Sequence, residues 1–244
     1  MQNKTFQALT KAAEHLMERS TDPIHDTGHA SRVVTYLKHM QGECGLTKSE
    51  RQAIIIAGWW HDVSRIITKN PSLVWMPLVD DLLSGGMLLW HLLKSGIYEW
   101  DAYLAIRLIW GKSLGTGAFL KKILLSKRNQ FLAHLLKDAD TLDTFAIERA
   151  AKMLELVDGY LRYEIGYKIV CRWFSLLHHI KMKTAAARKY IIQLLREFIA
   201  WIKQPHIIAW HVDHFGHRWT RKSLSRMEHA TVRLNSSSLS SFNG

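Results

Sequence analysis

The sequence contains the segment Ile54-Ile55-Ile56-Ala57-Gly58-Trp59-Trp60-His61-Asp62, in which an apolar run ends in two adjacent polar residues. Such a run is buried when the chain folds, so it carries the imidazole and the carboxylate at its end to the edge of the core. A neutral imidazole beside a carboxylate supplies two ligands of a divalent-metal site. Two adjacent ligands do not complete such a site, so we expect the remaining ligands from other parts of the chain.

Two other stretches supply candidates for these ligands. They read His25-Asp26-Thr27-Gly28-His29-Ala30-Ser31-Arg32-Val33 and Lys137-Asp138-Ala139-Asp140-Thr141-Leu142-Asp143. The order of the three stretches (His, then His-Asp, then Asp) resembles the HD superfamily of metal-dependent phosphohydrolases. The patterns around His29 and Asp140 are similar to those of its small single-domain bacterial members, and the resemblance covers about residues 22–150.

This resemblance implies an all-α fold, an HD-domain helical bundle whose metal ligands are His29, His61, Asp62 and Asp140. Two histidines and two aspartates form a mixed nitrogen and oxygen site, which suits Mn, Fe, Co or Zn better than Mg. A metal that accepts six ligands keeps positions for a water, which it acidifies, and for a phosphoryl oxygen, which it polarises.

We expect one divalent ion per chain. Members of the superfamily that hold two metals carry extra histidines between the His-Asp pair and the last Asp. This chain has Trp110 and Lys112 where such a histidine often stands, and His91 is the only histidine between His61 and His134.

The sequence leaves open the roles of the polar residues next to these ligands. His25, Asp26, Arg32 and Asp143 are expected to contact the ligands rather than the metal. Asp26 also precedes a predicted helix, so capping is its default role.

The sequence leaves the general base open: either Asp62 accepts a proton from the attacking water, or the metal alone suffices. Arg65 and Lys69 are candidates for binding phosphate oxygens, although plain surface charge is the alternative, as it is for Lys112. Some nucleotidases of the superfamily have a glutamate just after the His-Asp pair, and Val63-Ser64-Arg65 has none.

Apolar spacing and capping signals predict helices throughout most of the chain, and no stretch alternates strictly enough for a strand. A capping box is expected at Thr47-Lys48-Ser49-Glu50. Asp140 is expected at the join of two helices, at the start of the second. The predicted helices cover about residues 6–20, 29–40, 47–61, 73–83, 87–93, 100–110, 131–137, 141–157, 160–180 and 185–202.

Residues 1–204 are predicted to form the HD-type helical domain, and residues 205–244 a basic extension with a Ser-rich, partly disordered end. We expect the chain beyond about Ser223 to be dispensable for folding. The extension contains His206, His211, Asp213, His214 and His217. Packing, a second metal site, and stacking of nucleic-acid bases on Trp210, Phe215 and Trp219 remain alternatives for it.

The net charge of +12 is concentrated near the end of the chain, since residues 160–244 contain 14 Lys and Arg against 4 Asp and Glu, a net of +10. A field of this sign attracts nucleotides, nucleic acid or acidic lipid, and a solvated basic face is the alternative. No stretch reaches the roughly 18–20 apolar residues of a membrane span. With no signal segment and two cysteines, the chain is expected to be cytoplasmic.

The sequence thus predicts a metal-dependent phosphohydrolase whose substrate is a phosphorylated small molecule, with a nucleotide as the leading candidate. The alternative is a catalytically inactive HD domain that acts as a nucleotide- or RNA-binding regulatory module, with nucleic acid bound through the basic last third. The oligomeric state stays open.

Overall fold

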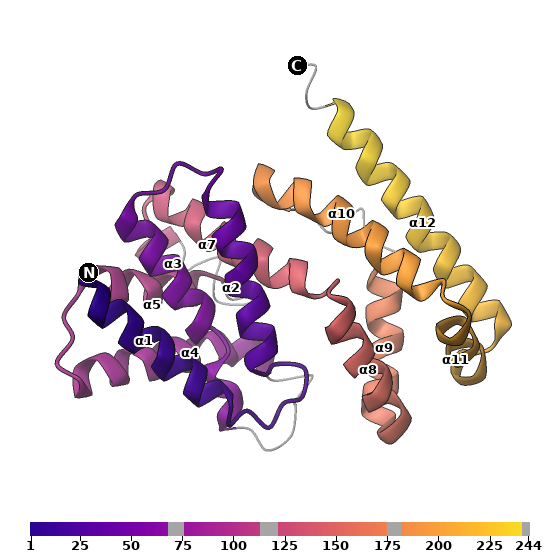
Figure 1. Ribbon diagram of the computed structural model, residues 1–244, viewed down its shortest axis with the longest axis horizontal. Coiled ribbons are helices and arrows are strands. Elements are labelled where there is room, and N and C mark those ends of the chain that lie inside the picture. The colour runs from indigo at the N-terminus through magenta and orange to yellow at the C-terminus, as the bar shows by residue number, and fades with distance from the viewer. Residues whose placement is uncertain (68–75, 113–121, 175–181, 241–244) are drawn as a thin grey trace. The chain divides into compact units, whose positions relative to one another are not determined.

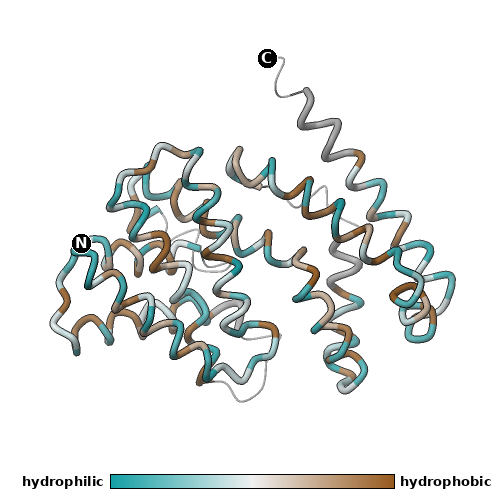
Figure 2. The backbone as a smooth tube through the Cα atoms, in the orientation of Figure 1, coloured by the Kyte–Doolittle hydropathy of each residue, from teal (hydrophilic) through white to brown (hydrophobic). Residues whose placement is uncertain are grey.

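The computed structural model describes residues 1–67, 76–112, 122–174 and 182–240. Within these ranges the regular elements are helices and no strand occurs, which confirms the all-α prediction. The chain divides into two compact units, Met1–Asp143 and Thr144–Gly244 (Figure 1). Hydrophobic and hydrophilic residues alternate along the helices of both units, as expected of helices with one buried face (Figure 2).

Unit 1 is organised around the helix that contains the apolar run. This helix, α3, packs against α1, α2, α5 and α7. Its side chains Ile54, Ile56 and Trp60 are fully buried, and the Trp60 indole donates a hydrogen bond to the Leu9 carbonyl at 3.0 Å. The elements of unit 1 are α1 (Asn3–Met17), α2 (Thr27–Gln41), α3 (Lys48–Trp60), η1 (Val63–Ile66), α4 (Met76–Lys94), α5 (Trp100–Lys112) and α7 (Lys127–Asp143).

The starts of α2 and α3 follow the predicted capping signals. The Asp26 carboxylate accepts a hydrogen bond from the His29 backbone N–H at 2.9 Å. Thr47 and Glu50 form the expected capping box, because each side chain accepts from the backbone of the other. These caps fix where the two helices begin, and therefore where His29 and His61 lie on them.

Two helix boundaries differ from the sequence-based prediction. Residues 76–94 form one helix, α4, although Gly85-Gly86 suggested a break. Gly85 instead lets Trp110 of α5 approach, since a Cβ there would lie 2.3 Å from the Trp110 Nε1 atom. Likewise α7 runs without interruption to Asp143, so Asp140 lies in the last turn of a helix and not at a helix start.

Unit 2 contains α8 (Ile147–Gly159), α9 (Leu161–Phe174), α10 (Ala185–Ile202), α11 (Pro205–Phe215) and α12 (His217–Ser240). Here α8 packs against α9, and α12 packs against α10 and α11. Pro205 lies at the first position of α11, where its missing N–H has no cost.

The extension predicted from residue 205 onward is therefore helical through Ser240, and residues 241–244 lie outside the described residues. Met227 and Thr231 of α12 are buried. That the chain beyond about Ser223 is dispensable for folding stays a prediction, but this part of α12 does bury side chains, because its apolar residues recur every three to four positions among the serines and arginines. The boundary between the compact units also falls at Asp143/Thr144 rather than after residue 204.

None of the helices in the described parts of the chain combines the length and the apolar character needed to cross a bilayer.

Candidate metal centre

Two histidines from different helices meet inside unit 1. His29 lies in the first turn of α2, and His61 directly follows α3. Because α2 and α3 pack together, the Nε2 atoms of the two imidazoles are 3.1 Å apart. Both side chains are fully buried.

Two carboxylates complete this cluster. The Asp62 Oδ2 atom lies 3.1 Å from His29 Nε2 and 3.4 Å from His61 Nε2. The Asp140 Oδ1 atom, carried by α7, lies 3.5 Å from His29 Nε2 and 3.7 Å from His61 Nε2. Neighbouring ligands at about 2.1 Å from a common metal are separated by about 3 Å, so this spacing fits one ion.

One side of the cluster is open to solvent. The Asp62 side chain is nearly buried, whereas the Asp140 side chain is 29% exposed. His29, His61 and Asp140 also form a group whose ligand atoms all lie within 4.8 Å of one another. The structure thus brings together the four residues that the sequence predicts as ligands, with access from the Asp140 side.

The outer nitrogens of both imidazoles are hydrogen-bonded to acceptors. His29 Nδ1 lies 2.7 Å from Asp143 Oδ2, and His61 Nδ1 lies 2.8 Å from the Gly58 carbonyl. A carboxylate and a carbonyl only accept, so both Nδ1 atoms carry the proton. In the neutral rings both Nε2 atoms then point lone pairs into the cluster.

Electrostatics in the cluster follow from this arrangement. Burial lowers the pKa of His61, but the charge of Asp62 and the contacts with both carboxylates outweigh it and raise this pKa to about 10. Burial likewise works against ionisation of Asp62, yet the His61 charge and both histidines hold its pKa well below the usual range. The cluster therefore attracts a positive charge strongly, whether a proton or a metal ion.

Lys112, the last residue of α5, provides a positive charge beside the cluster. Its ammonium donates a hydrogen bond to Asp140 Oδ2 at 2.8 Å and lies 3.5 Å from Asp81 Oδ1 of α4. Burial lowers the pKa of Lys112, but the charges of Asp140, Asp81 and Asp62 raise it above its ordinary value. The same ammonium helps to hold the pKa of Asp140 well below the usual range, against the effect of burial.

Arg65 has a different environment from the one predicted for a phosphate-binding residue. It is buried, and its guanidinium forms ion pairs with Asp80 at 2.7 Å and with Asp22 at 3.4 Å. Burial and the charge of Asp62 raise the pKa of Asp80 to about 7, with Arg65 opposing them. The Ser64 hydroxyl also donates to Asp80. Arg65 therefore joins η1 to α4, while Lys69 lies outside the described residues.

The predicted neighbours of the ligands contact them from outside. Asp143 accepts from His29 and from Arg32, whose Nε lies 2.5 Å from Asp143 Oδ1. The His25 ring lies edge-on to His29, with 5.4 Å between ring centroids, and its Nδ1 is 2.8 Å from Asp22 Oδ2. Asp26 has the capping role that we expected by default.

Three buried acids near the centre were missed in the sequence: Asp22, Asp80 and Asp81. For the last two a signal existed, since an adjacent acidic pair inside the apolar helix segment Leu78-Val79-Asp80-Asp81-Leu82-Leu83 requires buried cations as partners. Asp22 gave no such signal, because the Thr21-Asp22-Pro23 sequence is equally typical of a surface turn.

In the histidine-rich segment of unit 2 only His211 is buried, whereas His206, His214 and His217 are exposed. His211 Nε2 lies 2.7 Å from the Tyr167 hydroxyl, and His214 Nε2 lies 2.9 Å from Asp158 Oδ1. The described residues of this segment contain no group with the ligand spacing seen at His29, His61 and Asp140.

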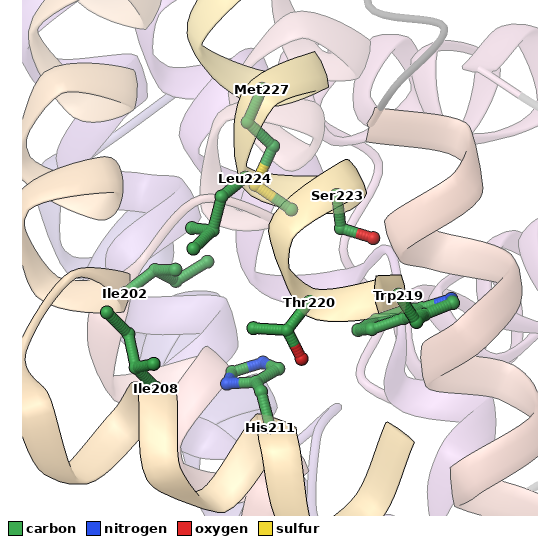
Figure 3. Close-up of a pocket in the computed structure, with 8 residues that line it drawn as sticks. All are labelled: Ile202, Ile208, His211, Trp219, Thr220, Ser223, Leu224 and Met227. Carbon is green, nitrogen blue, oxygen red and sulfur yellow. The ribbon is translucent and has the colours of Figure 1, made fainter. Parts of the chain in front are cut away.

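A small cavity also lies among α10, α11 and α12 (Figure 3). It is lined by Ile202, Ile208, His211, Trp219, Thr220, Ser223, Leu224 and Met227. Its volume is about 10 Å³, whereas pockets for small molecules measure roughly 300–1,000 Å³. It is an imperfection in packing and not a substrate site.

The chain was compared with protein-family models, with curated proteins and with solved structures, and no match was found in any of the three. Any statement about activity therefore depends on the geometry of this centre and on its residue pattern.

Proposed function

We propose that the chain is an HD-type metal-dependent phosphohydrolase, which hydrolyses a phosphate ester or anhydride of a small molecule. A nucleotide is the leading candidate for this substrate. One observation carries the proposal. Four acceptor atoms, His29 Nε2, His61 Nε2, Asp62 Oδ2 and Asp140 Oδ1, converge within 3.1–3.7 Å of His29 or His61. With both Nδ1 protons directed outward, the neutral rings present lone pairs there, and a cation bound in place of the His61 proton relieves their repulsion.

The donor set fits a divalent transition metal. Two imidazole nitrogens and two carboxylate oxygens suit Mn, Fe, Co or Zn, and Asp143 and Gly58 orient the two rings as neighbours of metal-bound histidines do. When bound, such an ion supplies Lewis acidity and an acidified water for attack on phosphorus.

The protein residues then divide the remaining work. Asp62 lies at the centre and is a candidate acceptor for the proton of the attacking water. Lys112 is the cation nearest the ligands among the described residues, so we assign to it the local positive charge that we expected of Arg65. We now expect Arg65 to position η1, because its guanidinium is paired with Asp80 and Asp22.

The proposal is tested by metal content followed by turnover. The chain is first stripped of metal and then dialysed against Mn²⁺ or Co²⁺, after which it should retain one ion. The loaded protein should hydrolyse at least one member of a panel of nucleotides and sugar phosphates. His61→Ala and Asp140→Ala should abolish turnover and weaken metal binding, whereas His39→Ala, at an exposed position of α2, should do neither. A loaded protein that is inactive on the whole panel would argue against an enzyme.

A binding module is the second candidate, and the charge of unit 2 favours it. Residues 144–244 contain 16 Lys and Arg and 7 Asp and Glu, so 16 − 7 gives +9 of the total of +12. On α12, four cations lie exposed on the helix surface: Arg218, Arg221, Lys222 and Arg226. A row of such cations suits the phosphates of nucleic acid. In that case metal binding would persist without turnover.

A further inference from the structure

The two carboxylate oxygens of Asp140 face two different places, the proposed metal position on one side and the Lys112 ammonium on the other. Oδ1 faces the imidazole nitrogens of His29 and His61, at 3.5 and 3.7 Å. Oδ2 accepts a hydrogen bond from the Lys112 ammonium at 2.8 Å. A carboxylate shared in this way between two cations is the usual bridge of two-metal centres, in which the ions are about 3.5–4 Å apart.

Lys112 is fixed in this place by its surroundings. Its side chain is 9% exposed, and the carboxylates of Asp140 and Asp81 face the ammonium from α7 and from α4. The preceding Gly111 lies so close to Leu125 that a Cβ there would be 2.7 Å from the Leu125 Cδ1 atom. The end of α5 is therefore held against its neighbours, and the ammonium cannot leave without exposing two carboxylates to each other.

We propose that the Lys112 ammonium occupies the position of a second cation in this centre, restricts the centre to one divalent ion, and acts as its fixed second positive charge. This inference rests on the proposed function, since it presumes a metal at His29, His61, Asp62 and Asp140. An ammonium has three N–H groups, and among the described residues two carboxylates face this one. We therefore assign its third N–H to an oxygen of the phosphoryl group.

Removal of the ammonium should then create a vacancy for a metal. In Lys112→Met and Lys112→Gln, the carboxylates of Asp81 and Asp140 lose their counter-charge, and oxygen ligands of this kind bind Mn²⁺ well. We expect the wild-type chain to bind one Mn²⁺ and both variants to bind two. The glutamine variant keeps a donor for Asp140, so it serves if the methionine variant does not fold.

The experiment uses the full chain, with Mn²⁺ counted by elemental analysis after equilibrium dialysis and its environment followed by electron paramagnetic resonance. One isolated Mn²⁺ gives a six-line spectrum, and two ions that share Asp140 give a spin-coupled one. Lys112→Gln combined with Asp81→Asn should return to one ion, because the second carboxylate is lost. The matched control Lys94→Gln, at an exposed lysine near the end of α4, should bind one ion.

The outcomes separate this inference from the proposed function. Two ions in the wild type, or a single ion in both Lys112 variants, overturns the role of Lys112 and leaves the hydrolase proposal standing. No ion in the wild type overturns both. One ion in the wild type and two in the variants, without turnover of any substrate, supports the role of Lys112 and overturns the hydrolase.

Discussion

The His29 ring is hydrogen-bonded through its Nδ1 atom, and its Nε2 atom faces the candidate metal centre. Its Nδ1 donates to Asp143, a fully buried carboxylate that also pairs with Arg32. This contact selects the tautomer with a lone pair on Nε2 and fixes the plane of the ring. We therefore expect Asp143 to support the proposed metal binding although it lies outside the set of candidate ligand atoms.

We expect Asp143→Asn to weaken Mn²⁺ binding by about 10–100-fold, the usual effect of losing the outer partner of a metal-bound histidine. Titration calorimetry with Mn²⁺ measures this, and circular dichroism checks that the helices persist. Glu14→Gln, which neutralises an exposed carboxylate of α1, should leave the affinity unchanged. Equal affinities of Asp143→Asn and the wild type would show that Asp143 does not orient the ligand.

His211 gives unit 2 a dependence on pH. Burial lowers its pKa from the ordinary 6.5, with a smaller effect of His214, and outweighs the hydrogen bond to the Ile207 carbonyl. Its Nε2 accepts from the Tyr167 hydroxyl, so the folded chain holds the neutral ring. The unfolded chain takes up a proton first as the pH falls below about 6.5, and stability is lost in that range.

Thermal unfolding between pH 8 and pH 5 should therefore show a greater loss of stability for the wild type than for His211→Gln. The difference is at most about 1.4 kcal/mol for each pH unit below 6.5, until the folded-state pKa is reached. His206→Gln removes an exposed histidine of the same helix and should keep the wild-type dependence. Parallel curves for the wild type and His211→Gln would contradict the assignment.

At the scale of elements, α4 links the metal centre to the packing of unit 1. It packs on α5 and on η1, and it carries Asp80 to Arg65 and Asp81 to Lys112. Its position against α5 depends on Gly85, over which the Trp110 ring lies. The Trp110 indole also donates to the Leu82 carbonyl at 3.2 Å. One residue of a glycine pair that suggests a helix break, Gly85, is thus a contact surface for Trp110.

The neighbouring glycines Gly85 and Gly86 allow a matched test of this contact. Gly85→Ala should lower the free energy of unfolding by about 1–3 kcal/mol, because the new methyl group overlaps Trp110. Gly86→Ala meets no atom within 4 Å and should raise that free energy by up to about 1 kcal/mol, since alanine favours a helix. Urea unfolding followed by circular dichroism measures both. Similar effects of the two substitutions would disprove the close approach of Trp110.

At the scale of the whole molecule, charge and metal ligands belong to different units. Unit 1 contains the four candidate ligands and a net charge of +3, the total of +12 less the +9 of residues 144–244. Chemistry on a small phosphorylated molecule requires positive charge only beside the metal, whereas binding of a nucleic acid uses many cations together. The two proposed functions therefore depend on different units.

Replacing Arg218, Arg221, Lys222 and Arg226 by Gln should leave hydrolysis of a small substrate unchanged. If the chain also binds single-stranded RNA, a plot of log K against the logarithm of the salt concentration should be less steep for this variant than for the wild type. The slope should change by roughly 3, because each of the four lost charges contributes about 0.7. Filter binding at several salt concentrations measures this. A control variant removes four exposed cations of unit 1, by glutamine at Lys4, Lys11, Lys38 and Lys48, and should keep the slope.

A loss of hydrolysis in the α12 variant, with its fold intact, would contradict the proposal that hydrolysis depends on unit 1 alone. The binding module would instead be favoured by tight, salt-sensitive RNA binding in a wild type that has no turnover.

The sequence by itself determined the helical class, the caps of α2 and α3, and the four residues that meet at the centre. The helical class and the caps depend on local patterns, namely apolar spacing and capping signals, whereas the four residues are predicted from the resemblance of the three motifs to the HD superfamily. The place of Asp140 in its helix could not be predicted, because the sequence around it is compatible with either a join or a continuous helix.

Tertiary structure alone decided which cation lies beside the ligands. Arg65 and Lys112 each place a positive charge near a helix end. The sequence around them does not indicate which of the two lies beside the candidate ligands. Asp80 and Asp22 pair with Arg65, whereas Asp81 and Asp140 hold Lys112 at the centre. Likewise, the sequence predicts a polar tail that includes Met227 and Thr231, and the structure buries both in unit 2. Such pairings join residues far apart in the chain, so their energy is absent from any local pattern.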